Sequence, residues 1–97
     1  MKRVRWAEAA TSDLTAIRDY LTETYSGDYA QFVIDRLILS TRWLLDHPSA
    51  GATIDHSRWR KWKPRRTRYI LVYEATAGGI DVVRVHHDRN DWRRPPK

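Results

Sequence analysis

The stretch YILVYEATAGGIDVVRVH, residues 69–86, decides the fold. Its opening run, Tyr69–Tyr73, is continuously apolar, which is typical of a strand buried on both faces. The AGG that follows at 77–79 is a hairpin turn signal, and Ile80–His86 is the returning strand. The sequence therefore predicts an antiparallel β-hairpin in the second half of the chain.

Upstream of this hairpin the pattern predicts one strand and a first helix. Residues 2–6 alternate, with Val4 and Trp6 on one side, which indicates a half-buried strand. The next apolar positions recur at helical spacing, with Asp13 on the opposing face, and the helix should stop near Tyr25. Those apolar positions are Ala10, Leu14, Ile17 and Leu21.

A second, longer helix follows a short connection. DYAQ, residues 28–31, resembles a capping box in which Asp28 is the acceptor and Gln31 reaches back. The helix must end by about His47, because Pro48 disfavours helical backbone at the residue before it. Two helices joined by so few residues form an antiparallel hairpin. The second apolar stripe consists of Ala30, Val33, Ile34, Leu37, Ile38, Thr41, Leu44 and Leu45.

Between the helices and the β-hairpin, Ile54–Lys63 mixes basic and aromatic residues, and Pro64 interrupts it. This composition indicates an edge or irregular strand. The predicted fold is therefore α+β with the order β-α-α-β-β-β, a helical hairpin packed on one face of a small, mainly antiparallel sheet. The other face stays partly open, and we expect the basic side chains of the second half to gather there.

The length and composition narrow the class of protein. The chain has 97 residues and no cysteine, so we expect one domain over residues 1–92, without a disulfide scaffold, a thiolate nucleophile or a sulfur-based zinc site. No stretch reaches the roughly 18 apolar residues that span a bilayer, and no signal-peptide apolar region follows the N-terminus. We therefore expect a cytoplasmic protein without membrane contact. Residues 93–97 have too little apolar content to pack and are expected to form a mobile basic tail.

The net charge of +6 is unevenly divided. Residues 1–46 carry six basic and seven acidic side chains, whereas residues 47–97 carry twelve basic and five acidic ones. A field this one-sided attracts polyanions or acidic protein segments, although a solvated basic face is the simpler interpretation of any such run.

VVRVHHDRNDW, residues 82–92, is the most concentrated group of side chains that could carry chemistry. Alternation along a strand separates the two histidines, so they cannot ligate one metal, and we expect neither a metal nor a cofactor. Arg84, His86 and Arg89 could lie near a phosphate, with the histidine as a proton carrier. Equally, Arg84 could pair with a carboxylate such as Asp91. The expected faces are Val83, Val85 and His87 on one side and Val82, Arg84 and His86 on the other.

RWRKWKPRRTR, residues 58–68, is a second such group, with seven cations and no acid. Interleaved cations and indoles suit single-stranded nucleic acid, in which charges hold phosphates and rings stack on bases. Alternatively, Trp59 or Trp62 is a core residue and the charges are its hydrated neighbours. Period 2 places Arg58, Arg60 and Trp62 on one face and Trp59, Lys61 and Lys63 on the other.

Several of these residues form one ordered pattern along the chain. They are Val4 and Trp6, then Ala10, Asp13, Leu14, Ile17, Tyr20 and Leu21, then Leu45, Pro48 and Gly51, then Tyr69–Tyr73, and finally Ile80, Val82, Val83, Val85, His87, Arg89, Asp91 and Trp92. In order and spacing the pattern resembles the RelE/ParE superfamily of type II toxins over residues 3 to 92.

This resemblance implies a toxin that is neutralised by an antitoxin, whose acidic, disordered tail folds along the helices and the sheet in a toxin–antitoxin hetero-oligomer. A chain this basic offers such a tail a complementary face. The residues that the resemblance assigns to the antitoxin are Leu14, Ile17, Tyr20, Leu21, Tyr69 and Tyr73.

The family divides by target. ParE-like members block DNA gyrase without a catalytic set, whereas RelE-like members cut messenger RNA on the ribosome. Ile70 stands where RelE-like toxins commonly have an arginine, so a ParE-like gyrase inhibitor is favoured. The alternatives are an mRNA interferase that uses His86 or His87, and a non-toxic remnant that binds only the antitoxin. The surface expected to contact the target or nucleic acid comprises Arg58, Arg60, Lys61, Lys63, Arg65, Arg66, Arg84, His87, Arg89 and Trp92.

Overall fold

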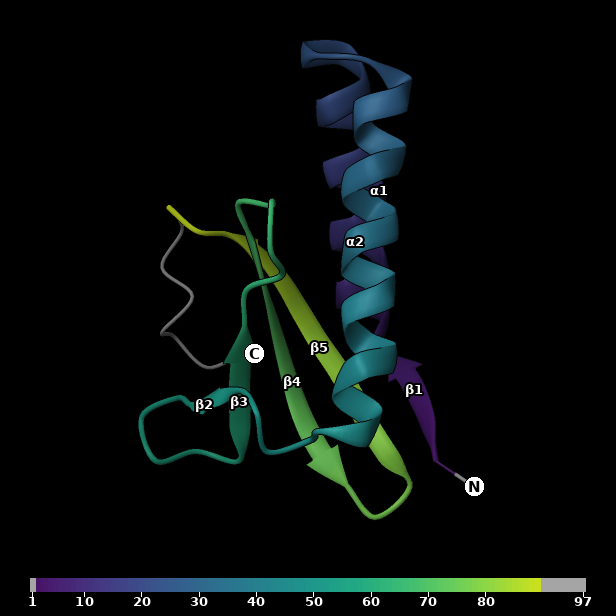
Figure 1. The fold of residues 1–97 in the computed structure, drawn as a ribbon. Coiled ribbons are helices and arrows are strands. Elements are labelled where there is room, and N and C mark those ends of the chain that lie inside the picture. Colours follow the sequence, from purple (N-terminus) through teal and green to yellow (C-terminus); the bar gives the residue numbers. More distant parts are fainter. Residues whose placement is uncertain (1, 90–97) are drawn as a thin grey trace.

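In the computed structural model, which describes residues 2–89, two helices pack on one face of a five-stranded sheet (Figure 1). The sheet order is β1-β5-β4-β3-β2, in which β1 runs parallel to β5 and every other pair is antiparallel. The α+β prediction is thus confirmed, with a two-residue strand added at the far edge. The elements are β1 (Arg3–Trp6), α1 (Glu8–Thr24), α2 (Gly27–Asp46), β2 (Ala52–Thr53), β3 (Trp59–Trp62), β4 (Tyr69–Thr76) and β5 (Gly79–His87).

The β4–β5 hairpin forms the centre of the sheet. Its turn closes at Gly79, whose φ of 137° is a conformation that residues with side chains rarely adopt. A Cβ at this position would also meet the backbone of Arg3 in β1. A register shift between Val72 and Tyr73 interrupts the ladder. The predicted strict alternation along β5 is therefore wrong, because Val82 and Val85 both belong to the core under the helices.

Both helices bury the apolar stripes that their spacing predicts. From α1 the core takes Ala10, Ile17 and Leu21, while Leu14 is partly buried. On α2, Ile38 departs from the expectation and stays 36% exposed. The sheet supplies the other half of the core, chiefly Leu71, Tyr73, Ile80, Val82 and Val85. The buried residues of α2 are Ala30, Val33, Ile34, Leu37, Thr41 and Leu44.

The start of α2 corrects the predicted capping box. Ser26, in extended backbone, is the N-cap, and its Oγ accepts a hydrogen bond from the Tyr29 amide at 3.0 Å. Asp28 already lies within the helix. Gln31 donates to the Asp35 carboxylate at 2.8 Å, one helical turn ahead, and does not reach back.

The buried Tyr73 hydroxyl fixes the connection after α2 against the sheet. It accepts a hydrogen bond from the Gly51 amide at 3.0 Å and donates to the Pro48 carbonyl at 2.8 Å. Arg60 Nη1 adds a hydrogen bond to the Gly51 carbonyl at 2.7 Å. A Cβ at residue 51 would lie 2.6 Å from the Tyr73 hydroxyl, so these contacts require glycine at that position.

Neither of the two helices within residues 2–89 is both long and apolar enough to cross a membrane.

Candidate functional site

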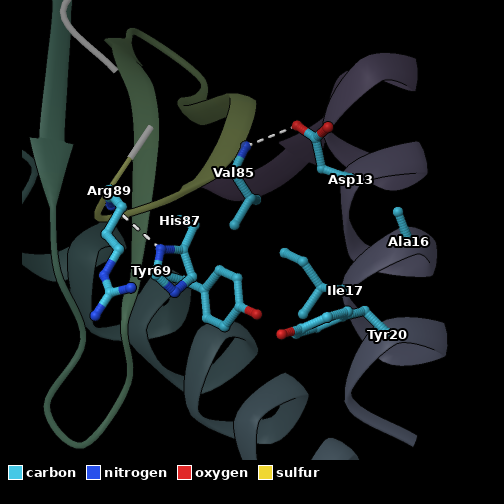
Figure 2. Close-up of a pocket in the computed structure, with 8 residues that line it drawn as sticks. All are labelled: Asp13, Ala16, Ile17, Tyr20, Tyr69, Val85, His87 and Arg89. Carbon is cyan, nitrogen blue, oxygen red and sulfur yellow. Dashed lines mark hydrogen bonds between the residues drawn. The ribbon is translucent and has the colours of Figure 1, made fainter. Parts of the chain in front are cut away.

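A groove of about 530 Å³ lies between α1 and the open end of the β4–β5 hairpin, where β4 begins and β5 ends (Figure 2). We call it the Tyr20–Tyr69 groove. It arises because β1 pairs with β5 only as far as Val82, after which the chain turns into α1 and leaves the rest of that β5 edge uncovered by a strand. Its lining residues are Asp13, Ala16, Ile17 and Tyr20 from α1 and Tyr69, Val85, His87 and Arg89 from the sheet side.

Asp13 joins α1 to the uncovered edge of β5. Its carboxylate accepts hydrogen bonds from Arg84 Nε at 2.8 Å and Arg84 Nη2 at 3.1 Å, and from the Val85 amide at 2.9 Å. The hydrogen bond to Asp13 raises the pKa of Arg84 above its ordinary value. Arg84 therefore pairs with a carboxylate, as one of the two interpretations expected, and that carboxylate is Asp13. Asp91, the example given there, lies outside the described residues.

Tyr69 and Tyr20 form the apolar end of the groove, and Figure 2 shows their hydroxyl groups directed toward one another. Tyr69 is only 6% exposed, whereas Tyr20 is 56% exposed. Burial, with a smaller contribution from Tyr20, raises the pKa of Tyr69, so its hydroxyl stays protonated. The groove thus presents a neutral hydroxyl within an apolar wall.

His87, at the end of β5, and the two residues after it make polar contacts beside Tyr69. His87 packs edge-on to Tyr69 with ring centroids 5.3 Å apart, and its Nδ1 accepts from the Arg89 amide at 3.2 Å. Asp88 bonds Lys63 Nζ at 3.2 Å, and this contact lowers the pKa of Asp88. Lys63, expected at the target surface, therefore already has a carboxylate partner.

The two histidines lie on opposite faces of the sheet. His87 is opposite Tyr69 and lines the groove, whereas His86 is opposite Ile70 on the face away from the helices. Burial, and then the charge of Arg84, lower the pKa of His86. The predicted phosphate cluster is thus dispersed, because Arg84 is bound to Asp13 and Arg89 lines the groove. Among the described residues no group of three or more His, Cys, Asp or Glu could hold a metal ion.

Within β3, the side chains of residues 59–62 alternate between the two faces of the sheet, as period 2 predicts for residues 58–68. Arg60 and Trp62 lie opposite the core residues Tyr73 and Leu71, and Lys61 lies opposite Val72 on the other face. Trp62 is half-buried and stacks on Trp43 of α2 at 5.0 Å.

The expectation that the cations gather on the open face is wrong. Arg60 bonds backbone carbonyls on the helix side, and Arg65 faces α2. Arg84 turns to α1, and Arg58 pairs with Glu74 at 3.3 Å. Arg60 and Arg84 turn away from the open face because each long side chain reaches an acceptor within the fold. Trp92 and the tail at 93–97 fall outside the part of the chain that the structure describes.

The residues assigned to an antitoxin divide into two groups. Ile17, Tyr20 and Tyr69 line the groove, and Leu14 is half-buried beside the core. By contrast, Leu21 and Tyr73 are 3% and 0% exposed, so they offer a partner almost no surface. The sequence pattern did not assign Ala16, Val85 or Asp13 to this site. The expected position of Asp13 on the face opposite the apolar stripe of α1 is wrong, because its carboxylate is 17% exposed and bonds β5. Its place in the ordered family pattern was the one signal of its role.

Comparisons with known proteins agree with this architecture. Residues 4–92 match the model of the family described as ParE toxin of type II toxin-antitoxin system, parDE. The fold is similar to a structure described as "Chromosomal ParDE TA system from P. aeruginosa", with a TM-score of 0.79 and 18% sequence identity, over 90% of this chain and 96% of that one. A comparison with curated proteins gives no match. Because the family model spans nearly the whole chain, the protein belongs to the ParE family and is the toxin component of a type II toxin–antitoxin system.

Proposed function

We propose that this toxin acts by inhibiting DNA gyrase, without cutting RNA, and that its antitoxin binds in the Tyr20–Tyr69 groove. The observation that carries the first part is the separation of the groups that RNA cleavage would need. His86 and His87 are on opposite faces of the sheet, and the Arg84 guanidinium is bound to Asp13.

Cleavage of a phosphodiester by acid–base catalysis requires proton carriers and cations around one phosphate. The lowered pKa of His86 leaves its imidazole neutral near pH 7, so it has no proton to give to a leaving group. Ile70, opposite it, is apolar where RelE-like toxins commonly carry an arginine. These features favour a toxin that acts by occupying a protein target.

The antitoxin proposal follows from the chemistry of the groove. Ile17 and Val85 contribute apolar surface, and the hydroxyls of Tyr20 and Tyr69 offer hydrogen bonds from the two sides of the groove. Arg89 at the rim supplies a positive charge. Such a lining suits an acidic segment that folds on docking with its apolar side inward and its carboxylates at the rim.

A supercoiling assay tests the gyrase proposal. Purified toxin should block the supercoiling of relaxed plasmid by gyrase in the presence of ATP, and the variant H86A should inhibit equally well. A parallel reaction with ribosome-bound message should show no cleavage. Normal supercoiling at saturating toxin, together with cleavage of the message, would reject the proposal.

A binding measurement tests the antitoxin proposal independently. Replacing Tyr20 by Ala should weaken antitoxin binding by roughly 30-fold, which corresponds to about 2 kcal/mol for an aromatic anchor. Y25A is the matched control, because Tyr25 is 65% exposed and lies outside the groove. Equal losses in the two variants, measured by calorimetry, would place the antitoxin elsewhere.

A further inference from the structure

A second hollow region runs along α2 beside the connection between β3 and β4. It consists of two neighbouring hollows of about 520 and 350 Å³, which we call together the α2 groove. The first is lined by Arg36, Leu39, Trp43, Trp62 and Arg65, and the second by Tyr29, Lys63, Arg66 and Arg68. Both hollows have one wall on α2 and the other on the chain from residue 62 to residue 68, and the α2 wall from Tyr29 to Trp43 is about 21 Å long.

Aromatic rings follow this wall from one end to the other. Trp43 is 44% exposed and stacks between Trp62, at 5.0 Å and 24°, and His47, at 4.1 Å and 13°. Toward the other end, Tyr29 and Phe32 are each 41% exposed, and their rings lie 6.4 Å apart at 20°. The α2 groove therefore offers several accessible ring faces and edges in a row.

The opposite wall is cationic. Arg36 Nε donates to the Arg65 carbonyl at 3.3 Å, which fixes the β3–β4 connection against α2. No acidic side chain lines either hollow. Within residues 2–89, the guanidinium groups of Arg65 and Arg66 form no ion pair with a carboxylate. Two arginines thus remain available to an anion from outside the chain.

The backbone at Arg66 gives a separate indication. Its φ is 64°, the left-handed region in which glycine or asparagine is cheaper than arginine. An arginine at such a position gains nothing for the turn itself. A requirement for the positive charge of Arg66 in this wall of the groove would explain why an arginine occupies the position.

We propose that the α2 groove binds single-stranded nucleic acid, with bases stacking on the exposed rings and phosphates contacting Arg65 and Arg66. Exposed aromatic rings beside a cationic track are the pattern that binds single strands without sequence preference. A partner helix would need aliphatic anchors along the groove, and Leu39 is the one aliphatic side chain that lines it. This binding is independent of gyrase inhibition and uses a region that the Tyr20–Tyr69 groove does not include.

Fluorescence anisotropy with the full chain and a labelled oligothymidylate tests the proposal without gyrase or antitoxin. At roughly 50 mM salt, binding should be detected below about 100 µM protein, as for other non-specific sites. Y29A, which removes a 41% exposed ring that lines the second hollow, should weaken binding at least roughly fivefold, the effect of losing one stacked base. R65A/R66N should lower the slope of log affinity against log salt by about 1.4, the value for two phosphate contacts. Asparagine at 66 keeps the left-handed backbone accessible.

The matched control is R3A/R5A, which removes two charges from β1 at the opposite edge of the sheet. It should retain the slope of the unaltered chain, and circular dichroism should show all variants folded. Three outcomes overturn the proposal: no binding at the highest protein concentration, equal losses in R65A/R66N and R3A/R5A, or tighter binding of a poly-glutamate peptide than of the oligonucleotide. An oligouridylate and a duplex of equal length distinguish DNA from RNA and single strands from double strands.

Discussion

Replacing Asp13 by Ala removes the carboxylate that hydrogen-bonds α1 to the uncovered edge of β5. The carboxylate is 17% exposed and its partner Arg84 is 34% exposed, so water partly screens the ion pair, and its loss costs about 1 kcal/mol. The Val85 amide also loses its acceptor, which adds about 2 kcal/mol if no water replaces it. We therefore expect the free energy of unfolding to fall by about 3 kcal/mol, and Tm by about 15 °C.

Urea denaturation followed by circular dichroism measures this loss, with D19A as the control. Asp19 lies on an exposed position of the same helix, so D19A should change the free energy of unfolding by less than about 0.5 kcal/mol. D13N should lose less of the free energy of unfolding than D13A, because its amide oxygen can still accept a hydrogen bond from the Val85 amide. A double-mutant cycle with R84A should give a coupling energy of about 1 kcal/mol. If D13A were as stable as D19A, the role assigned to Asp13 would be wrong.

Three further predictions concern the core and the sheet. Y73F should lower the free energy of unfolding by about 2 kcal/mol, because the buried Gly51 amide loses its hydrogen-bond acceptor. An unchanged midpoint in chemical denaturation would contradict this. G79A should cost about 3 kcal/mol, because its φ is 137° and its new Cβ would meet the Arg3 backbone; G78A, with open space around it, is the control and should be nearly neutral. His86 has a lowered pKa in the folded state, so the unfolded chain takes up its proton first. The stability that this neutral imidazole contributes is present above pH 6.5 and is lost as pH falls through the folded pKa. In H86Q, the free energy of unfolding should therefore decline less steeply over that pH range. An NMR titration midpoint for His86 at or above 6.5 would refute the assignment.

The predicted elements were confirmed where the pattern was local and periodic. The stripes on the two helices, the end of α2 before Pro48 and the β4–β5 hairpin all match the structure, because burial of one helix face or strand face imposes a fixed spacing. The capping box failed because Ser26 offered an acceptor two residues earlier, and a pattern alone does not choose between competing caps. The two-residue β2 has too few residues to produce a period.

The candidate site was predicted less completely. Sequence reasoning assigned Ile17, Tyr20 and Tyr69 to partner binding, and the structure places all three on one groove. It also assigned Leu21 and Tyr73, which are buried, because an apolar residue on a helix or strand gives no sign of whether it faces the core or a partner.

By itself, the sequence determined which segments are helices and strands, which residues form the core, and to which family the chain belongs. Only the tertiary structure decided where the charges and the histidines lie. A β-bulge changed the faces along β5, and Arg84 found its carboxylate at Asp13, 71 residues away. The physical reason is that burial follows from local periodicity, whereas the partner of a long charged side chain depends on which distant segments the fold brings within hydrogen-bonding distance.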